Sequence, residues 1–238
     1  SGFEHHVVIV PRKDYSLFKP LLVHGIQLIA AEEFLPNHLV QTWISRFWWD
    51  RTTLKMRRGW LVQQLIKLAA TLELDADACV FADSDACFIR PFDANSLWYN
   101  NKVRLFRSER APLFYTNRRY LNWYGAAGEL VQKSQDSLDY AYISQLTSMR
   151  KDNVESMIAR IQEWLGLRDW QRALLEVGDI SEFILYGCFC EQQPYSNGHW
   201  FSSEQLCHSS WFYHIDSPQD IEVYLGKLSA KQVAVHVQ

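Results

Sequence analysis

Short apolar runs alternate with amphipathic stretches in the first half of the chain. A β-branched run at 6–10, closed by Pro11, is typical of a buried strand, and a second run spans 26–30. The amphipathic stretch 17–22 lies between them, which gives strand–helix–strand order. Leucines then recur on one helical face and predict a helix over 60–70. The run 78–82 is too short for a helix and has acids on both sides, so we expect a central strand.

The second half continues the same alternation. A strand is expected at 103–106 and an amphipathic helix at 154–164, with Trp164 on its apolar side and Gly166 ending it. Further apolar segments lie at 183–186 and 233–237, and residues 107–150 are expected to form decorated loops. This order predicts one α/β domain over 1–238, a mostly parallel, Rossmann-like mixed sheet flanked by helices. Its ligand should bind beyond the carboxyl ends of the strands.

Composition narrows the class of protein. The chain has 238 residues, 48% hydrophobic and 21% charged, which is typical of a globular domain and excludes disordered and collagen-like proteins. A net charge of −3 argues against a nucleic-acid partner. No apolar stretch approaches the roughly 20 residues of a membrane span, so no transmembrane segment is expected. Five cysteines, an odd number, favour a reducing compartment, and we expect a cytoplasmic protein or one peripheral to the inner face of the membrane.

Two Asp-x-Asp patterns flank the predicted central strand. Asp75 and Asp77 precede it, whereas Asp83 and Asp85 follow it and should therefore lie at its ligand-binding end. Residues i and i+2 of an extended segment face the same side about 6.6 Å apart, close enough to hold one hard cation. Carboxylates prefer Mg²⁺ or Mn²⁺, and such a cation can neutralise a departing diphosphate. The alternative is a simple turn, in which Asp is common.

Four further residues are candidates for chemistry. Glu182 precedes an apolar segment and could orient or deprotonate an acceptor hydroxyl, with Asp179 as the nearest substitute. The alternative for Glu182 is a carboxylate at a helix N-terminus. Gln64 and Lys67 lie at the edge of the apolar stripe of their helix, from which they could reach the carboxyl end of the sheet, Lys67 contacting phosphate, or simply meet solvent.

Other features carry structural and functional interpretations side by side. Ten tryptophans could stack on sugars or fill the core, and two basic clusters could hold an anion, although solvated faces are favoured. The segment 197–200 reads as a sugar contact or a surface turn with an incidental His199, and His208 and His214 raise the same question. Cys188 and Cys190, taken as alternating on a strand, lack zinc-site spacing. Serine-hydrolase, classical dehydrogenase and P-loop motifs are missing from the sequence. The basic clusters are Arg51, Lys55, Arg57 and Arg58, and Arg107, Arg110, Arg118 and Arg119.

The segment 81–92 resembles the nucleotide-sugar-binding strand of GT-A glycosyltransferases, in which an apolar run ends in Asp-x-Asp and a second apolar run follows. The segments 142–146, 157–163 and 181–187 are similar to DUF6492, a bacterial family regarded as GT-A-like, and the resemblance covers roughly 55–215. It implies a GT-A fold that takes a sugar from a nucleoside-diphosphate donor with Mn²⁺ or Mg²⁺. It also implies Asp85 as a direct metal ligand, Asp83 on the ribose or a metal-bound water, and His236 as a late metal ligand.

The sequence therefore predicts a metal-dependent glycosyltransferase acting on an acceptor hydroxyl, such as a saccharide, in bacterial surface polysaccharide or glycoconjugate synthesis. One alternative is a non-catalytic sugar-binding module on the same fold. Another is a nucleotidyltransferase, although residues 11–14 lack the glycine-rich loop usual after the first strand of such enzymes.

Overall fold

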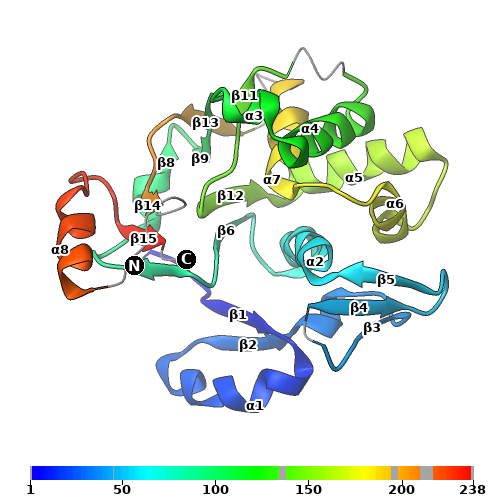
Figure 1. Cartoon of the computed structure of the whole chain (residues 1–238), viewed down its shortest axis with the longest axis horizontal. Coiled ribbons are helices and arrows are strands. Elements are labelled where there is room, and N and C mark those ends of the chain that lie inside the picture. Colours follow the sequence, from blue (N-terminus) through cyan, green and yellow to red (C-terminus); the bar gives the residue numbers. More distant parts are fainter. Residues whose placement is uncertain (1, 45, 134–137, 194–197, 210–216, 237–238) are drawn as a thin grey trace.

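A computed structural model describes residues 2–44, 46–133, 138–193, 198–209 and 217–236 (Figure 1). The strands are β1 Val7–Val10, β2 Gln27–Ala30, β3 Leu39–Gln41, β4 Phe47–Asp50, β5 Lys55–Arg58, β6 Ala78–Ala82, β7 Ala86–Phe88, β8 Trp98–Tyr99, β9 Lys102–Phe106, β10 Ser108–Glu109, β11 Tyr140–Ala141, β12 Leu146–Arg150, β13 His199–Ser202, β14 Cys207–Ser209 and β15 Ala234–His236. The α-helices are α1 Tyr15–Phe18, α2 Gly59–Glu73, α3 Leu113–Thr116, α4 Arg118–Leu130, α5 Lys151–Leu165, α6 Trp170–Val177, α7 Glu182–Glu191 and α8 Pro218–Gly226. Short 3₁₀ helices are η1 Arg12–Asp14, η2 Lys19–His24, η3 Ala31–Phe34 and η4 Ala94–Leu97.

The expected elements of the first half form, but the strand expected to be central, β6, is only partly buried and, within the part of the chain that the structure describes, pairs with a single strand, β12. Strands β1 and β2 pair in parallel, and the chain between them forms η1, α1 and η2. Helix α2 buries Leu61, Leu65 and Leu68 in the main core, as the leucine spacing predicts. It leads directly into β6, the strand that ends just before Asp83. The helix–strand unit that presents the acidic pair is therefore encoded locally.

The sheet arrangement differs from the prediction. The fold is mixed α/β, but its sheets have only two or three strands, and among the described residues three strand pairings are parallel and six antiparallel. The expectation of a mostly parallel sheet is wrong because β12, inside the stretch taken as loops, runs antiparallel beside β6. Strand β12 also lies against β9, where the Ser148 hydroxyl donates to the Arg104 carbonyl.

The helices of the second half are partly as expected. Helix α5 ends at Gly166, whose φ of 64° is the left-handed conformation that glycine adopts without strain. Trp164 is 52% exposed rather than packed on the apolar side. Residues 183–190 belong to helix α7, so the two cysteines do not alternate on a strand. This helix is buried on all sides, which removes the amphipathic pattern that identifies helices from sequence.

Helices α2, α4, α5 and α7 enclose the largest buried cluster, at the upper right of Figure 1. A polar network crosses it: the Tyr186 hydroxyl accepts from the Arg150 backbone N–H and the Asn153 amide. The same oxygen lies 2.6 Å from Nε2 of His199, whose Nδ1 lies 2.9 Å from the Val103 carbonyl. Because a carbonyl can only accept, Nδ1 carries the proton and Tyr186 donates to Nε2. No described helix is long and apolar enough to cross a bilayer.

Candidate functional site

The acidic pair lies in a tight turn between β6 and β7. The Ala86 N–H donates to the Asp83 carbonyl at 2.9 Å, and the Asp83 N–H donates to the Gln145 carbonyl at 3.4 Å. The turn interpretation is therefore correct for the backbone, and the expected extended geometry is not what places these side chains. Instead, each carboxylate meets a different partner from a distant part of the chain.

Asp83 belongs to a three-residue charge cluster. The Lys67 ammonium, from α2, lies 2.9 Å from Oδ1 of Asp83 and 2.8 Å from Oε1 of Glu182, the first residue of α7. Lys67 also sits 4.4 Å from the centre of the Phe183 ring. The structure thus brings together three of the residues singled out from the sequence, with Lys67 between two carboxylates rather than free to reach a phosphate.

The cluster is largely removed from water. The side chains of Glu182 and Lys67 are 2% and 12% exposed, whereas that of Asp83 is 33% exposed. Burial by itself would lower the pKa of Lys67, but the charges of Glu182 and Asp83 outweigh it, so the pKa is raised above its usual value. Lys67 therefore stays cationic, and Asp83 is the member of the cluster that solvent can reach.

Asp85 meets the other end of the chain. Its Oδ2 lies 3.0 Å from Nε2 of His236, a buried residue on β15. The opposite ring nitrogen, Nδ1, lies 3.4 Å from the Ser209 hydroxyl on β14. The Tyr224 hydroxyl lies 2.8 Å and 2.9 Å from the carbonyl oxygens of His236 and His208, which fixes these two strands together. The imidazole is thus held with Nε2 toward Asp85.

Cys207, on β14, is fully buried and packs with Leu146 and Ala234. Burial, followed by the charges of Asp85 and Asp83, raises the pKa of its thiol to about 12. The thiol is therefore neutral at ordinary pH. Sequence reasoning did not place Cys207 or Ser209 near the acidic pair; their spacing along one short strand is the only local signal.

The donor types at Asp85 and His236 fit a divalent cation, because carboxylate oxygen and neutral imidazole are ordinary ligands for Mn²⁺. Their 3.0 Å separation is that of an imidazole–carboxylate hydrogen bond, which a bound cation would replace. Within the described residues no group of three or more His, Cys, Asp or Glu side chains converges. The two side chains would supply only part of a coordination shell, and substrate or water would have to complete it.

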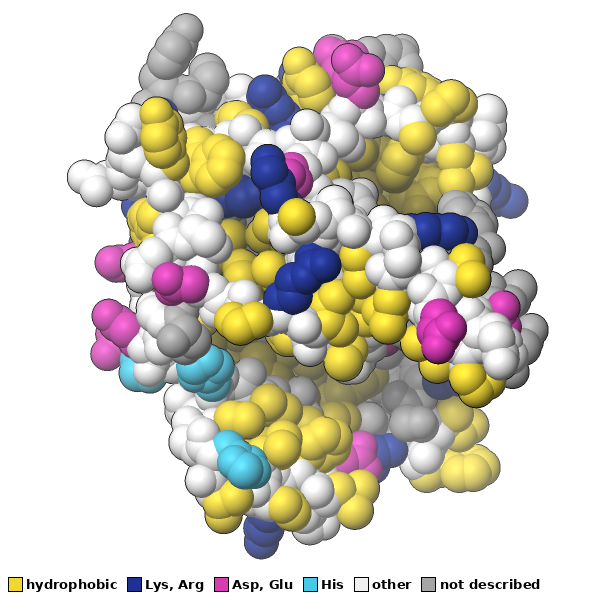
Figure 2. Space-filling view, turned by 90° about the vertical axis from the view of Figure 1, so that its left-hand side faces the viewer, with side chains coloured by type: hydrophobic (Ala, Val, Ile, Leu, Met, Phe, Trp, Pro, Cys, Tyr) yellow, Lys and Arg dark blue, Asp and Glu magenta, His cyan; other side chains and the backbone are white. Residues whose placement is uncertain are grey.

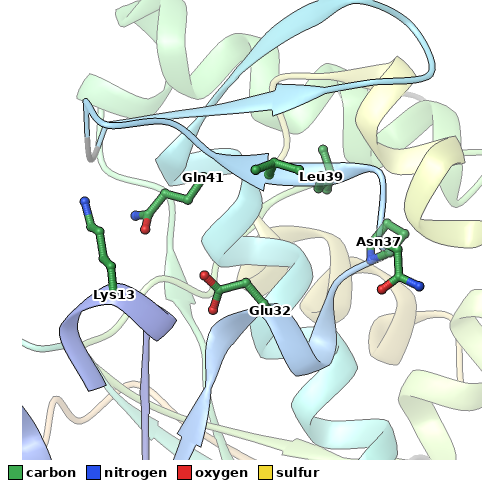
Figure 3. A pocket seen from close by; sticks show the side chains of 7 residues that line it. Lys13, Glu32, Asn37, Leu39 and Gln41 are labelled. Atoms are coloured by element: carbon green, nitrogen blue, oxygen red, sulfur yellow. The ribbon is translucent and has the colours of Figure 1, made fainter. Parts of the chain in front are cut away.

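The remaining predicted site residues lie apart from this cluster. Gln64 is buried, and its amide donates to the Trp60 carbonyl of its own helix at 2.8 Å, so it neither reaches the strand end nor meets solvent. Asp179 is exposed, 3.4 Å from the Asn122 amide, and lines a depression of about 490 Å³ between α4 and the loop that follows α6. A second pocket, of about 320 Å³, lies beyond β1 and β2 and includes Lys13, Glu32 and Gln41 (Figure 3).

Several residues that had both a functional and a structural interpretation have structural roles. Arg57 is buried against Asp50 and Glu176, and Arg107 pairs with Glu191, so neither cation is free for an anion. His199 lies in the core rather than in a surface turn. Trp60 stacks on Trp123 beneath the Arg119 guanidinium, which places two of the tryptophans in packing. Asn197 and His214 lie outside the described residues.

A family model described as a family of unknown function (DUF6492) matches residues 1–217. The chain belongs to the DUF6492 family. A search of curated proteins finds no match. The family match contains Lys67, Asp83, Asp85 and Glu182, but it ends before β15. The buried charge cluster therefore lies within the part that defines DUF6492, whereas His236 lies beyond it.

Proposed function

We propose that this DUF6492 protein is a metal-dependent glycosyltransferase with a GT-A-like arrangement, transferring a sugar from a nucleoside-diphosphate sugar to an acceptor hydroxyl. The observation that carries the proposal is the 3.0 Å pairing of Asp85 with His236 beside Asp83, directly after strand β6. Two acids after a strand, one of them matched with an imidazole, are suited to holding a cation that binds a diphosphate. Assembly of a bacterial surface saccharide is the setting we propose for this activity.

Asp85 and His236 would hold Mn²⁺ or Mg²⁺, and Ser209 would keep the ring of His236 oriented through its other nitrogen. The bound cation would offset the charge that develops on the departing diphosphate. Asp83, the most exposed member of the charge cluster, would bind the ribose or a water in the cation's shell.

Lys67 and Glu182 act as positioning residues in this scheme. Lys67 holds Oδ1 of Asp83 and thereby fixes the carboxylate while its other oxygen stays available. Glu182 holds Lys67 from the opposite side and is too deeply buried to meet an acceptor hydroxyl directly. We therefore assign the proposed general-base role to neither Glu182 nor the distant Asp179 in this conformation.

The proposed reaction breaks the bond between the sugar's anomeric carbon and the diphosphate and forms one between that carbon and the acceptor oxygen. The hydroxyl proton leaves to solvent or to a substrate oxygen, and the nucleoside diphosphate departs with the bonding electron pair. Free nucleoside diphosphate is therefore the product to detect.

The test measures thermal shifts for a panel of nucleoside diphosphates and their sugars, with and without Mn²⁺, followed by chromatography of released nucleoside diphosphate. We expect Mn²⁺ to be required for stabilisation by at least one nucleotide. Asp85→Asn and His236→Gln should each lose that shift while keeping a cooperative melt. Asp75→Asn, which changes the exposed acid before β6, should behave like the wild type.

The outcomes separate the candidate functions. Nucleotide binding that needs neither Mn²⁺ nor Asp85 would contradict the metal site. Saccharide binding without release of nucleoside diphosphate would indicate a sugar-binding module. Release of pyrophosphate from a nucleoside triphosphate would indicate a nucleotidyltransferase.

A further inference from the structure

The segment from residue 12 to residue 24, formed by η1, α1 and η2, leaves its apolar side chains in solvent. None of its residues is buried. Leu17 and Val23 are 74% and 81% exposed, and Phe18 and Leu22 are also exposed. Single exposed leucines are ordinary, but four large apolar side chains within seven residues form a contiguous feature that water disfavours. We call residues 12–24 the interfacial segment.

The interfacial segment lies at the lower edge of the molecule in Figure 1, below β1 and β2. Figure 2 shows hydrophobic side chains gathered over this lower part of the surface. The helices of the main core lie at the other side of the fold, so no described element covers the segment. Its apolar side chains therefore face outward, away from the charge cluster at Lys67.

The charges around these apolar side chains are predominantly positive. Arg12, Lys13 and Lys19 belong to the segment against a single acid, Asp14, and from residue 15 to residue 31 the sequence contains no further Asp or Glu. Arg12 is engaged by acids, since its N–H donates to Glu32 and its guanidinium lies 4.0 Å from Glu33. Among the described residues no carboxylate pairs with Lys13 or Lys19. The surface thus combines exposed aliphatic groups with available cations.

A second exposed group follows β3, the strand that lines a pocket together with Lys13. Lys13 lines the same pocket as Val40 and Gln41 of β3, and Figure 3 shows its side chain rising toward that strand. Just beyond β3, Trp43 is 91% exposed and is followed by the exposed Ile44. Tryptophan is the residue most characteristic of the boundary between lipid and water, because its large ring carries one polar N–H.

We propose that the interfacial segment, with Trp43, docks the protein onto the surface of an anionic phospholipid bilayer. Leucine, phenylalanine and valine side chains would enter the boundary between headgroups and acyl chains, while Lys13 and Lys19 contact lipid phosphates. The segment is far too short to span a bilayer, so it lies on the surface. An anionic surface can meet both the exposed aliphatic groups and the available lysines, whereas a second copy of this chain, with the same positive segment, would be repelled. The proposal does not depend on the glycosyltransferase activity.

The test is co-sedimentation of the full chain with vesicles of phosphatidylcholine alone or with 30% phosphatidylglycerol. We expect binding to the mixed vesicles and weak binding to the neutral ones. Lys13→Gln with Lys19→Gln should lower binding to mixed vesicles roughly 30-fold, since each cation contributes about fivefold. Leu17→Ser with Val23→Ser should lower binding by at least about tenfold at both compositions.

The control is Leu54→Ser with Val223→Ser, which removes two apolar side chains elsewhere that are 70% and 53% exposed and should leave binding unchanged. Thermal melts establish that each variant is folded. No sedimentation with either vesicle, or equal binding by wild type and the Leu17/Val23 variant, would overturn the proposal. Concentration-dependent dimerisation that this variant abolishes would overturn it in favour of a second copy as the occupant.

Discussion

Replacing Lys67 with methionine tests the central physical feature of the site, because it removes the cation and nearly preserves the volume. The variant leaves Glu182, which is 2% exposed, beside Asp83 with no intervening positive charge. Removing one partner of a buried ion pair costs about 3–5 kcal/mol. Asp83 is one third exposed and can turn to water, so we expect the lower end, about 3 kcal/mol of lost unfolding free energy.

Two further variants isolate the pairing. Glu182→Gln leaves Lys67 with Asp83 and should cost only about 1–2 kcal/mol, the scale of one weakened charged hydrogen bond. If the two residues interact, the double variant should be less destabilised than the sum of the single variants by about 1–3 kcal/mol. Lys55→Met removes an exposed lysine paired with the half-exposed Glu176 and should cost under about 1 kcal/mol.

The assay is equilibrium unfolding in urea, followed by tryptophan fluorescence at constant pH. A loss of unfolding free energy below about 1 kcal/mol for Lys67→Met would refute the reasoning, because leaving a buried carboxylate unpaired should destabilise the fold by more than that. Strict additivity of Lys67→Met and Glu182→Gln would also refute it, since independent residues would not constitute a cluster.

Two predictions concern the core. Burial lowers the pKa of His199 to about 4 from 6.5, so the unfolded chain binds an extra proton between these values. The contribution of His199 to the free energy of unfolding should therefore be fully present above pH 6.5. It should fall by about 3 kcal/mol as the pH drops to 4. Urea unfolding at pH 7.5, 5.5 and 4 measures this, and an equal pH slope in His199→Gln would contradict it. Alanine at Gly187 would place its Cβ against the Tyr142 ring, so G187A should destabilise by roughly 1–3 kcal/mol. Alanine at Gly226, which has open space around it, is the matched control, and equal melting temperatures for the two variants would disprove the packing argument.

The elements whose patterns are local could be predicted from the sequence. The apolar run before Asp83 encodes β6, the leucine repeat encodes α2, and Gly166 ends α5. Membership of DUF6492 could also be inferred from motifs in the chain, and the family match confirms it. Sequence patterns did not predict α7, because this helix is buried on all sides and has no polar face. They did not predict β12 either, because its partner strand lies over 60 residues earlier in the chain.

The residues of the candidate site show the same difference between what local patterns predict and what the tertiary structure decides. The sequence identified Asp83, Asp85 and Glu182 beside predicted apolar segments and Lys67 at the edge of an apolar stripe, whereas His236 was implied by the resemblance to GT-A glycosyltransferases. Only the tertiary structure decided which of them meet: Lys67 with Asp83 and Glu182, and Asp85 with His236. The physical reason is that hydrophobic periodicity depends on neighbours a few residues apart, whereas Asp85 and His236 are brought together by the packing of separate strands, which no local pattern records.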